Sequence, residues 1–352
     1  MKKISLLIIS VLCLFACSKT STKVELQNKL DRCELRNSKL PKMIEIKGGK
    51  FTVDKDDEMY KHISSGSYTA DIQNFKISLT EVTQKQFEYV MGVNPSFFKY
   101  CDSTNNSYNG KDDATSYLPV EQVNWYHAIT YCNKLSILEG KDICYTIEGL
   151  TTPKDWASLN YEDIPTALSW RSDAQIPTKG NTDKSELTKW NYVKCNFGNN
   201  GYRLPTSTEW EYAARGGKSQ TDDSTRYAGS KDNIDEVAWY KGNSYNYNND
   251  NADCAYHCKE DYGTKPVATK KPNELGIYDM TGNVDEWCWN WNTEAFPKST
   301  PSGEVQPEKG ANRVIRGGSW RGDEGICHIS SYSVTAPEFI LEDLGFRVAA
   351  SK

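Results

Sequence analysis

The sequence stretch that decides the fold lies near the C-terminal end and reads Gly276-Ile277-Tyr278-Asp279-Met280-Thr281-Gly282-Asn283-Val284-Asp285-Glu286-Trp287. Two shorter stretches follow it, Arg316-Gly317-Gly318-Ser319-Trp320 and Leu344-Gly345-Phe346-Arg347-Val348. The segments 314–320 and 344–350 are bounded by glycine and polar residues, which predicts short strands. Few helices and many irregular, aromatic-rich loops indicate an α+β domain rather than a parallel α/β sheet.

Three short helices are predicted from their start signals. Each begins at a residue that can cap a helix N-terminus, and these residues are Thr83 with Gln86, Asn124, and Thr206 with Glu209. Gly92 and Gly216 are the expected stops for the first and the last helix. Apolar residues recur at helical spacing after each cap, so we expect three amphipathic surface helices.

The composition bounds the class of protein. The chain has 352 residues, of which 38% are hydrophobic, so it can bury a sizeable core. A net charge of −5 gives no basic surface for a phosphate backbone, which argues against a nucleic-acid partner. Since no linker or internal repeat divides the chain after residue 43, residues 44–352 are expected to form one domain.

The N-terminus carries an export signal. Lys2 and Lys3 precede an apolar run that is too short to span a bilayer, and residues 1–16 are interpreted as a signal peptide. The run ends in Leu14-Phe15-Ala16-Cys17, which resembles a lipobox, so Cys17 is expected to be acylated. Residues 17–43 would then be a polar spacer from the membrane. An ordinary signal peptide with an incidental cysteine is the alternative.

Cysteine usage fits an exported protein but leaves the pairing open. Eleven cysteines are present, and removing Cys13 and Cys17 leaves an odd number. Cys254 and Cys258 flank His257, but a metal site would need further ligands. A local disulfide or two free thiols is the favoured interpretation.

The motifs resemble those of the formylglycine-generating-enzyme (sulfatase-modifying factor) family, a variant of the C-type lectin fold. Besides the opening stretches, the family-like segments are Leu79-Thr80-Glu81-Val82-Thr83, Pro119-Val120-Glu121-Gln122-Val123-Asn124-Trp125, Gly201-Tyr202-Arg203-Leu204-Pro205-Thr206 and Glu209-Trp210-Glu211-Tyr212-Ala213-Ala214-Arg215. They occur in family order over about 300 residues. We expect Arg203, Glu209 and Glu211 to form buried scaffold ion pairs.

The resemblance argues against the family's oxidase chemistry. Family enzymes use a cysteine pair after the Gly-Gly-Ser motif to bind copper(I), an ion that prefers soft thiolates. The corresponding positions are Gly322 and Cys327. Only half of the pair is present, so no catalytic residue is predicted, and Cys327 is expected to be a buried packing residue.

The resemblance also implies a structural calcium ion. Asp279 and Glu286, with the backbone carbonyls of Gly282 and Val284, correspond to the family's second calcium site. Calcium prefers six to eight hard oxygen ligands, which carboxylates and turn carbonyls can supply. The alternative is a turn in which the two carboxylates accept backbone N–H groups without an ion.

The 23 residues between Trp320 and Leu344 have no clear periodicity and are held between two motifs. Such a tethered, mixed segment is typical of a recognition surface. The candidate ligand-binding residues are Arg321, Asp323, Glu324, His328, Ser331, Tyr332, Val334, Thr335, Glu338, Phe339, Leu341 and Asp343, with support from Trp239 and Tyr240. The arrangement resembles variable proteins of diversity-generating retroelements, such as the treponemal variable lipoprotein, which vary this region.

The function predicted from the sequence is therefore ligand binding at the cell envelope. The expected protein is a lipid-anchored, non-enzymatic protein on the outer surface that binds a protein or glycan through residues 321–343. A formylglycine-generating type of oxidoreductase or maturation factor acting through Cys327 is the alternative, and an envelope component without a ligand is a third hypothesis.

The lipid anchor can be tested directly. Replacing Cys17 by Ser should release the protein from membranes, because stable anchoring needs two or more acyl chains and nothing else in the chain is apolar enough to hold it there. Detergent phase partitioning of Cys17→Ser measures this, with Cys13→Ser as the matched control that should stay membrane-bound. Equal partitioning of the two variants would contradict the lipoprotein prediction.

Overall fold

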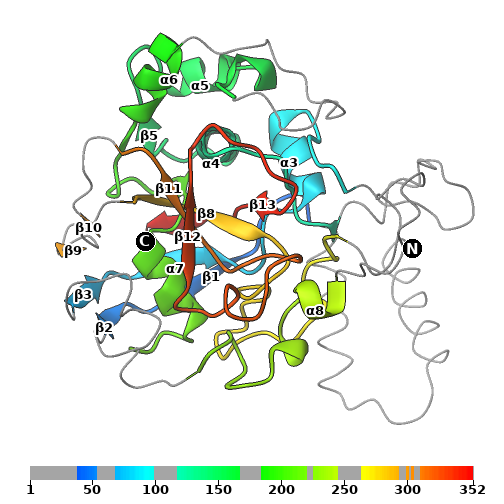
Figure 1. Ribbon diagram of the computed structural model, residues 1–352. Helices are drawn as coiled ribbons and strands as arrows, with labels where there is room; N and C mark the ends of the chain where they lie inside the picture. Colours follow the sequence, from blue (N-terminus) through cyan, green and yellow to red (C-terminus); the bar gives the residue numbers. More distant parts are fainter. Residues whose placement is uncertain are drawn as a thin grey trace, which may run out of the picture. The chain divides into compact units, whose positions relative to one another are not determined.

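The α+β architecture predicted from the sequence is confirmed in the computed structural model (Figure 1). The structure describes residues 38–53, 68–98, 117–166, 184–219, 225–244, 263–292, 299–300, 303–304 and 310–351. Lys39–Lys352 form one compact unit, which begins slightly before the predicted start at residue 44. The signal segment, Cys17 and most of the spacer lie outside the described residues, as do Cys254, His257 and Cys258.

The helices are short and scattered among the strands. Their bounds are α3 Gln84–Met91, α4 Trp125–Leu138, α5 Pro153–Ser158, α6 Lys184–Asn191, α7 Ser207–Ala214 and α8 Lys241–Ser244, with 3-10 turns at Tyr161–Asp163 and Ile234–Glu236. The strands are β1 Met43–Ile46, β2 Gly49–Val53, β3 Tyr68–Ile72, β4 Phe75–Ser78, β5 Tyr145–Thr146, β6 Lys194–Cys195, β7 Tyr202–Arg203, β8 Asp285–Trp291, β9 Ser299–Thr300, β10 Gly303–Glu304, β11 Arg313–Arg316, β12 Tyr332–Thr335, β13 Leu344–Gly345 and β14 Ala349–Ser351.

Two four-stranded sheets organise the domain. One has the strand order β1-β4-β14-β7 and joins the first strand to the last, while the other has the order β12-β11-β8-β13. Pairing between these strands is antiparallel except for β13, which runs parallel to β8. Because β13 and β14 belong to different sheets, the end of the chain links the two sheets (Figure 1).

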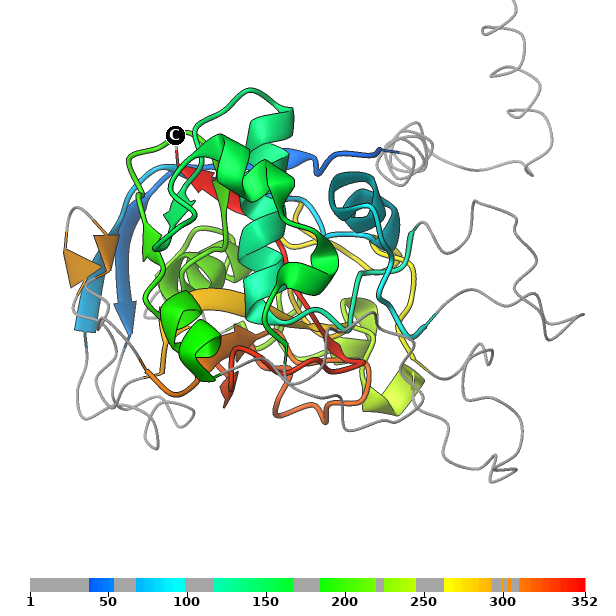
Figure 2. The same ribbon diagram turned by 90° about the horizontal axis from the view of Figure 1, so that it is seen from above.

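Strand β8 separates two hydrophobic clusters. Trp287 and Trp289 point into the cluster built around α4, whereas Cys288, between them, belongs to the cluster that contains Trp210 of α7. This alternation follows from the two-residue period of a strand. Figure 2 shows α4 lying across the side of β8 that carries the tryptophans. Both faces of this sheet are therefore covered by the domain itself.

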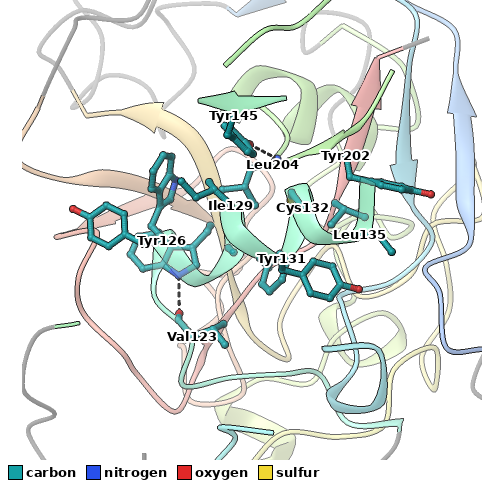
Figure 3. Close-up of a cluster of buried hydrophobic side chains, with 14 of the residues drawn as sticks. Val123, Tyr126, Ile129, Tyr131, Cys132, Leu135, Tyr145, Tyr202 and Leu204 are labelled. Carbon is teal, nitrogen blue, oxygen red and sulfur yellow. Dashed lines mark hydrogen bonds between the residues drawn. The ribbon is translucent and has the colours of Figure 1, made fainter. Parts of the chain in front are cut away.

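The prediction that all three capped helices are amphipathic surface helices is wrong for two of them. In α7 every side chain except that of Glu209 is buried, and α4 is enclosed in the same way. The side chains of α4 are buried around almost its whole circumference, from Trp125 to Ser136. A helix that is buried all round belongs to a core rather than to a surface. In Figure 3, Tyr126, Ile129 and Leu135 lie within this cluster, and the Leu204 N–H donates to the Tyr145 hydroxyl at 2.7 Å.

The predicted start signals are confirmed. Thr83 and Thr206 each accept the backbone N–H three residues ahead, and Gln86 and Glu209 bond back to the cap residue. Asn124 caps α4 in the same reciprocal way, with His127 as the second member. The reciprocal bonds satisfy N–H groups that have no partner within the helix.

Two predicted strands are shorter than expected. The strand predicted at 314–320 ends at Arg316, because Gly317 and Gly318 adopt φ angles of 98° and 70°. A Cβ atom at Gly318 would lie 2.6 Å from Sγ of Cys327, so only glycine fits this turn. The strand predicted at 344–350 is divided into β13 and β14, and Arg347 lies between them.

Buried ion pairs hold the elements together, as the sequence predicted for Arg203, Glu209 and Glu211. Arg203 pairs with Glu209 at 2.7 Å, and Glu211 pairs with both Arg215 and Arg316 at 3.0 and 3.1 Å. These pairs connect α7 to β7 and to β11. Since a buried charge without a partner is costly, each arginine depends on its carboxylate.

The pair of Glu286 and Arg347 is the most extensive of these contacts. Nε and Nη2 of Arg347 donate to the two carboxylate oxygens at 2.6 and 2.7 Å, and both side chains are fully buried. Trp210 Nε1 donates to the same carboxylate at 2.7 Å. The remaining Arg347 donors reach the carbonyl oxygens of Ser78, Tyr278 and Asp279.

Replacing Glu286 by Gln should lower the free energy of unfolding by about 3–5 kcal/mol, because it leaves Arg347 buried without a counter-charge. Urea unfolding measures the loss. Glu45→Gln is the matched control, since Glu45 pairs with Lys76 at 3.6 Å on the exposed surface and should cost less than about 1 kcal/mol. Similar losses in both variants would contradict this role for the buried pair.

Candidate functional site

The predicted recognition segment, residues 321–343, is described throughout its length. It leaves the Gly-Gly-Ser-Trp turn, passes through turns up to Ser331, forms β12 and returns through residues 336–343 to β13. In Figure 1 it is the orange-to-red chain that includes β12. Strand β12 pairs with β11 on one side only and forms one end of its sheet.

The two ends of the segment are joined by an ion pair. Nε and Nη2 of Arg321 donate to the carboxylate of Asp343 at 2.6 and 2.8 Å, and Arg321 also lies 3.5 Å from Glu342. Ser319 Oγ donates to Asp343 at 3.1 Å. A bidentate arginine–carboxylate pair fixes both groups in one plane. The segment is therefore closed at its base by its own first and last residues.

Asp285 lies beside this ion pair. Its backbone N–H donates to the Asp343 carbonyl at 2.8 Å, and its carboxylate accepts the Gly318 N–H. Burial raises the pKa of Asp285 well above its usual value, and the nearby Asp343 carboxylate raises it further. Arg321 and the Gly318 N–H oppose this effect without cancelling it.

The twelve candidate residues fall into three groups by exposure. The exposed ones are Arg321, Asp323 and Glu324. The half-buried ones are His328, Tyr332, Val334, Thr335, Glu338, Phe339 and Leu341. The buried ones are Ser331 and Asp343. Most of the candidate side chains are therefore at least partly accessible to a ligand.

The two buried candidates belong to the scaffold rather than to a contact surface. Ser331 donates to the Gly325 carbonyl at 2.8 Å, and Asp343 is held by Arg321. Tyr240 is also buried, against the expectation of a supporting contact. Trp239 is half-buried, and its indole N–H donates to Thr269 at 2.7 Å.

Sequence reasoning missed one exposed apolar residue in the segment, Ile326, which exposes 46% of its surface. The adjacent Cys327 is fully buried, so the two neighbours point in opposite directions. The only available signal was an isoleucine between Gly325 and a cysteine predicted to be buried. No periodic pattern surrounds Ile326, which is why its exposure could not be inferred.

The two positions that correspond to the family's copper ligands are neighbours in space. A Cβ atom at Gly322 would lie 3.5 Å from Sγ of Cys327. Gly322 supplies no thiol, and Cys327 is buried in a cluster that contains Tyr227, Val237 and Tyr240. Burial raises the pKa of Cys327, so its thiol is protonated at neutral pH. The residues present here do not fit a paired thiolate site.

The side chains assigned to calcium already have protein partners. Both oxygens of Glu286 accept from Arg347, and Asp279 Oδ2 accepts the Ala268 N–H at 2.7 Å. No cluster of three His, Cys, Asp or Glu side chains suited to a metal occurs within the described ranges. Because Arg347 already neutralises Glu286, these contacts favour the alternative of a turn without an ion. Calcium binding at Asp279, Gly282, Val284 and Glu286 is not tested by them and stays a prediction.

The chain belongs to the sulfatase-modifying factor enzyme 1-like domain family, whose model matches residues 31–352. It is 36% identical over 324 residues to the chaperone protein LppX of Paenibacillus barcinonensis, covering 88% of this chain and 89% of that protein. It is 32% identical over 203 residues to the inactive C-alpha-formylglycine-generating enzyme 2 of Mus musculus, covering 54% of this chain and 57% of that protein.

A solved structure, the Treponema denticola variable protein 1, superimposes with a TM-score of 0.66 at 31% identity. The match covers 88% of this chain and 95% of that one. The predicted family and its C-type-lectin-like fold are therefore confirmed. Within the residues that the structure describes, no helix has the length and apolar character needed to cross a membrane.

The raised pKa of Asp285 predicts a pH effect. The folded state binds this proton more tightly than the unfolded state, so the associated stability is present at low pH and is lost as the pH rises through the raised pKa. Asp285→Asn should therefore be more stable than the unchanged protein near neutral pH. Urea unfolding at about pH 5 and about pH 8 measures the difference, because these values span the range above the usual aspartate pKa.

Asp232→Asn is the control for this experiment, since Asp232 is exposed and lies 3.8 Å from Arg226. It should leave the pH dependence of stability unchanged. If Asp285→Asn had the same pH dependence as this control, Asp285 would not be the group that titrates.

Proposed function

We propose that this protein is a lipid-anchored, non-enzymatic binding protein of the bacterial cell envelope that contacts its ligand through residues 321–343. The observation that carries the proposal is the closed base of this segment, where Arg321 and Asp343 pair across the whole segment. A loop tied to a rigid scaffold holds its side chains in place and binds at a low entropic cost. Exposed side chains such as Asp323 and Ile326 then form the contact surface.

The similarities are consistent with a binding role. One of the similar structures is the Treponema denticola variable protein 1. Its fold matches 88% of this chain and 95% of its own chain. Variation at the exposed positions of such a segment is tolerated because surface substitutions typically change stability by about 0.5 kcal/mol or less. In this chain, residues 321–343 follow a Gly-Gly-Ser-Trp motif and end at a Leu-Gly-Phe-Arg-Val motif, which favours a variable segment between two fixed motifs.

The charge of the segment indicates the kind of ligand. Its acidic residues are Asp323, Glu324, Glu338, Glu342 and Asp343. Arg321 is its only arginine or lysine, and it is engaged by Asp343. Asp343 is buried, but Asp323, Glu324 and Glu338 are accessible. Together with apolar groups such as Ile326 and Phe339, they favour a basic protein ligand with apolar side chains over a glycan.

A second candidate function is that of a chaperone for another exported protein. The observation that favours it is the 36% identity to the chaperone protein LppX over most of both chains. Both candidates require a binding surface rather than thiol chemistry. A formylglycine-generating activity is the remaining alternative, and it would need Cys327 to act without a second cysteine at position 322.

The surrounding DNA distinguishes a variable binding protein from a chaperone. A second, adenine-rich near-copy of the codons for residues 315–350, beside a reverse-transcriptase gene, would support diversification. A chaperone with one client would have no such copy. Sequencing the locus in several isolates would also reveal whether substitutions are confined to residues 321–343.

The binding surface can be tested with peptides selected on the purified protein from a random phage-displayed library. Truncating Phe339 to Ala should weaken their binding by about 2 kcal/mol, or about thirtyfold, because hot spots are large side chains near the centre of an interface. Tyr89→Ala is the matched control, since Tyr89 is an exposed aromatic residue on α3. Isothermal titration calorimetry with one selected peptide measures both variants.

Cys327→Ser separates binding from catalysis. The binding proposal expects peptide affinity to be nearly unchanged, while a thiol-dependent enzyme would lose turnover of a cysteine-containing sulfatase peptide. Peptides that lose affinity with Tyr89→Ala but not with Phe339→Ala would contradict the proposed surface. Formylglycine formation by the unchanged protein would contradict its non-enzymatic character.

A further inference from the structure

Arg313 of β11 is a buried cation enclosed by aromatic rings. Its side chain has no exposed surface, and its guanidinium carbon lies 3.6 Å and 3.4 Å from the ring centroids of Trp125 and Trp291. Trp289 lies at 5.0 Å, and its carbonyl oxygen accepts a hydrogen bond from Nη1 of Arg313 at 2.5 Å. Cation–π contacts of this kind stabilise a cation but carry no negative charge.

Arg313 differs from the other fully buried arginines of the described chain. Arg203, Arg215, Arg316 and Arg347 each pair with a glutamate at distances from 2.6 to 3.1 Å. Over the described ranges, no carboxylate lies within ion-pair distance of Arg313. Burial without a carboxylate lowers the pKa of Arg313 well below its usual value, although Tyr126 and Tyr145 oppose this. Among the described residues, this cation is thus desolvated without the usual counter-charge.

The remaining hydrogen-bond donors of Arg313 indicate which kind of chemical group could bind to it. Nε and Nη2 of Arg313 are buried and have no acceptor within the described part of the chain. These two N–H groups lie on the same edge of the planar guanidinium, and this edge binds the two oxygens of a carboxylate side by side. Arg347 uses the same two atoms to bind Glu286 in this protein. Buried donors are rarely left without an acceptor, so the free edge indicates a ligand.

The position of Arg313 links it to the edge of the sheet. Arg313 lies directly opposite Thr335 in the pairing of β11 with β12. Directly opposite residues of an antiparallel pair point to the same face. Thr335 is half-buried and ends the edge strand, whereas Arg313 is covered completely. A ligand that reached Arg313 beside Thr335 would have to be small.

We propose that Arg313, whose guanidinium lies between the rings of Trp125 and Trp291, binds a small carboxylate anion at its free edge, with both carboxylate oxygens accepting from Nε and Nη2. This site is separate from the contact surface formed by exposed side chains of residues 321–343, and it does not depend on the protein's binding a macromolecule there. The carboxylate supplies the missing counter-charge and satisfies both donors. Phosphate carries the same oxygens but is larger, so it should bind less well in this enclosed site.

The proposal is tested with sodium acetate as the probe, against sodium chloride at equal ionic strength and sodium phosphate as the larger anion. Acetate should raise the melting temperature of the unchanged protein by a few degrees over chloride, because a ligand that binds only the folded state stabilises it. It should also change the tryptophan fluorescence, since Trp125 and Trp291 contact the guanidinium.

Arg313→Lys keeps the charge but removes the two-donor edge, so it should lose the acetate effect. Arg226→Lys, at an exposed arginine, is the matched control and should keep it. If Arg313→Lys does not fold, the unchanged protein decides alone through its fluorescence and melting curves. Equal behaviour in acetate and chloride, or an acetate effect that persists in Arg313→Lys, would overturn the proposal. A phosphate effect larger than that of acetate would overturn the assignment to carboxylates.

Discussion

The buried pair of Glu286 and Arg347 is the interaction on which the rest of the structure depends. Glu286 belongs to β8, and Arg347 lies between β13 and β14, so the pair ties the two sheets together at the point where the chain passes from one to the other. Trp210 of α7 and the carbonyl of Ser78 in β4 complete its hydrogen bonds. In a low-dielectric interior such a network is favourable only when every member is satisfied, and here the network fixes the relative position of four elements.

The rigidity of this centre explains how one irregular segment can carry the proposed function. Residues 321–343 begin after the turn that follows β11 and end at β13, so both of their ends belong to the sheet that contains Glu286. The pair of Arg321 and Asp343 closes the segment independently of what lies between them. Side chains such as Asp323 and Ile326 can differ in chemistry without affecting the core, because they contribute little to its packing.

The same framework separates binding from the oxidase chemistry of family enzymes. The turn after β11 places Gly322 beside Cys327, so the two positions are neighbours in space while only one of them carries a thiol. The remaining thiol packs against Tyr227 and Tyr240 and is held protonated by burial. The position that the family resemblance assigned to a copper ligand therefore contributes to the core here. This illustrates why a shared fold does not establish a shared reaction.

The sequence by itself determined the features that depend on near neighbours or on fixed motif spacing. Thr83, Asn124 and Thr206 could be identified as helix caps, because a cap bonds only to residues three positions ahead. The bounds of the proposed recognition segment and the missing partner of Cys327 followed from the spacing of the motifs. The family and its fold followed from the same motifs.

Only the tertiary structure decided which groups meet across long stretches of chain. Glu286 and Arg347 are 61 positions apart, and nothing local to either residue indicated that the carboxylate assigned to calcium would accept from an arginine. The burial of α4 on all sides, of Ser331 and of Asp343 likewise depends on what packs against them. Nothing in the sequence distinguishes Arg313 from an ordinary strand residue. The structure shows that tryptophans of α4 and β8 enclose its guanidinium and that two of its donors have no acceptor among the described residues. Burial and charge pairing are properties of the assembled chain, since they depend on distances that sequence separation does not specify.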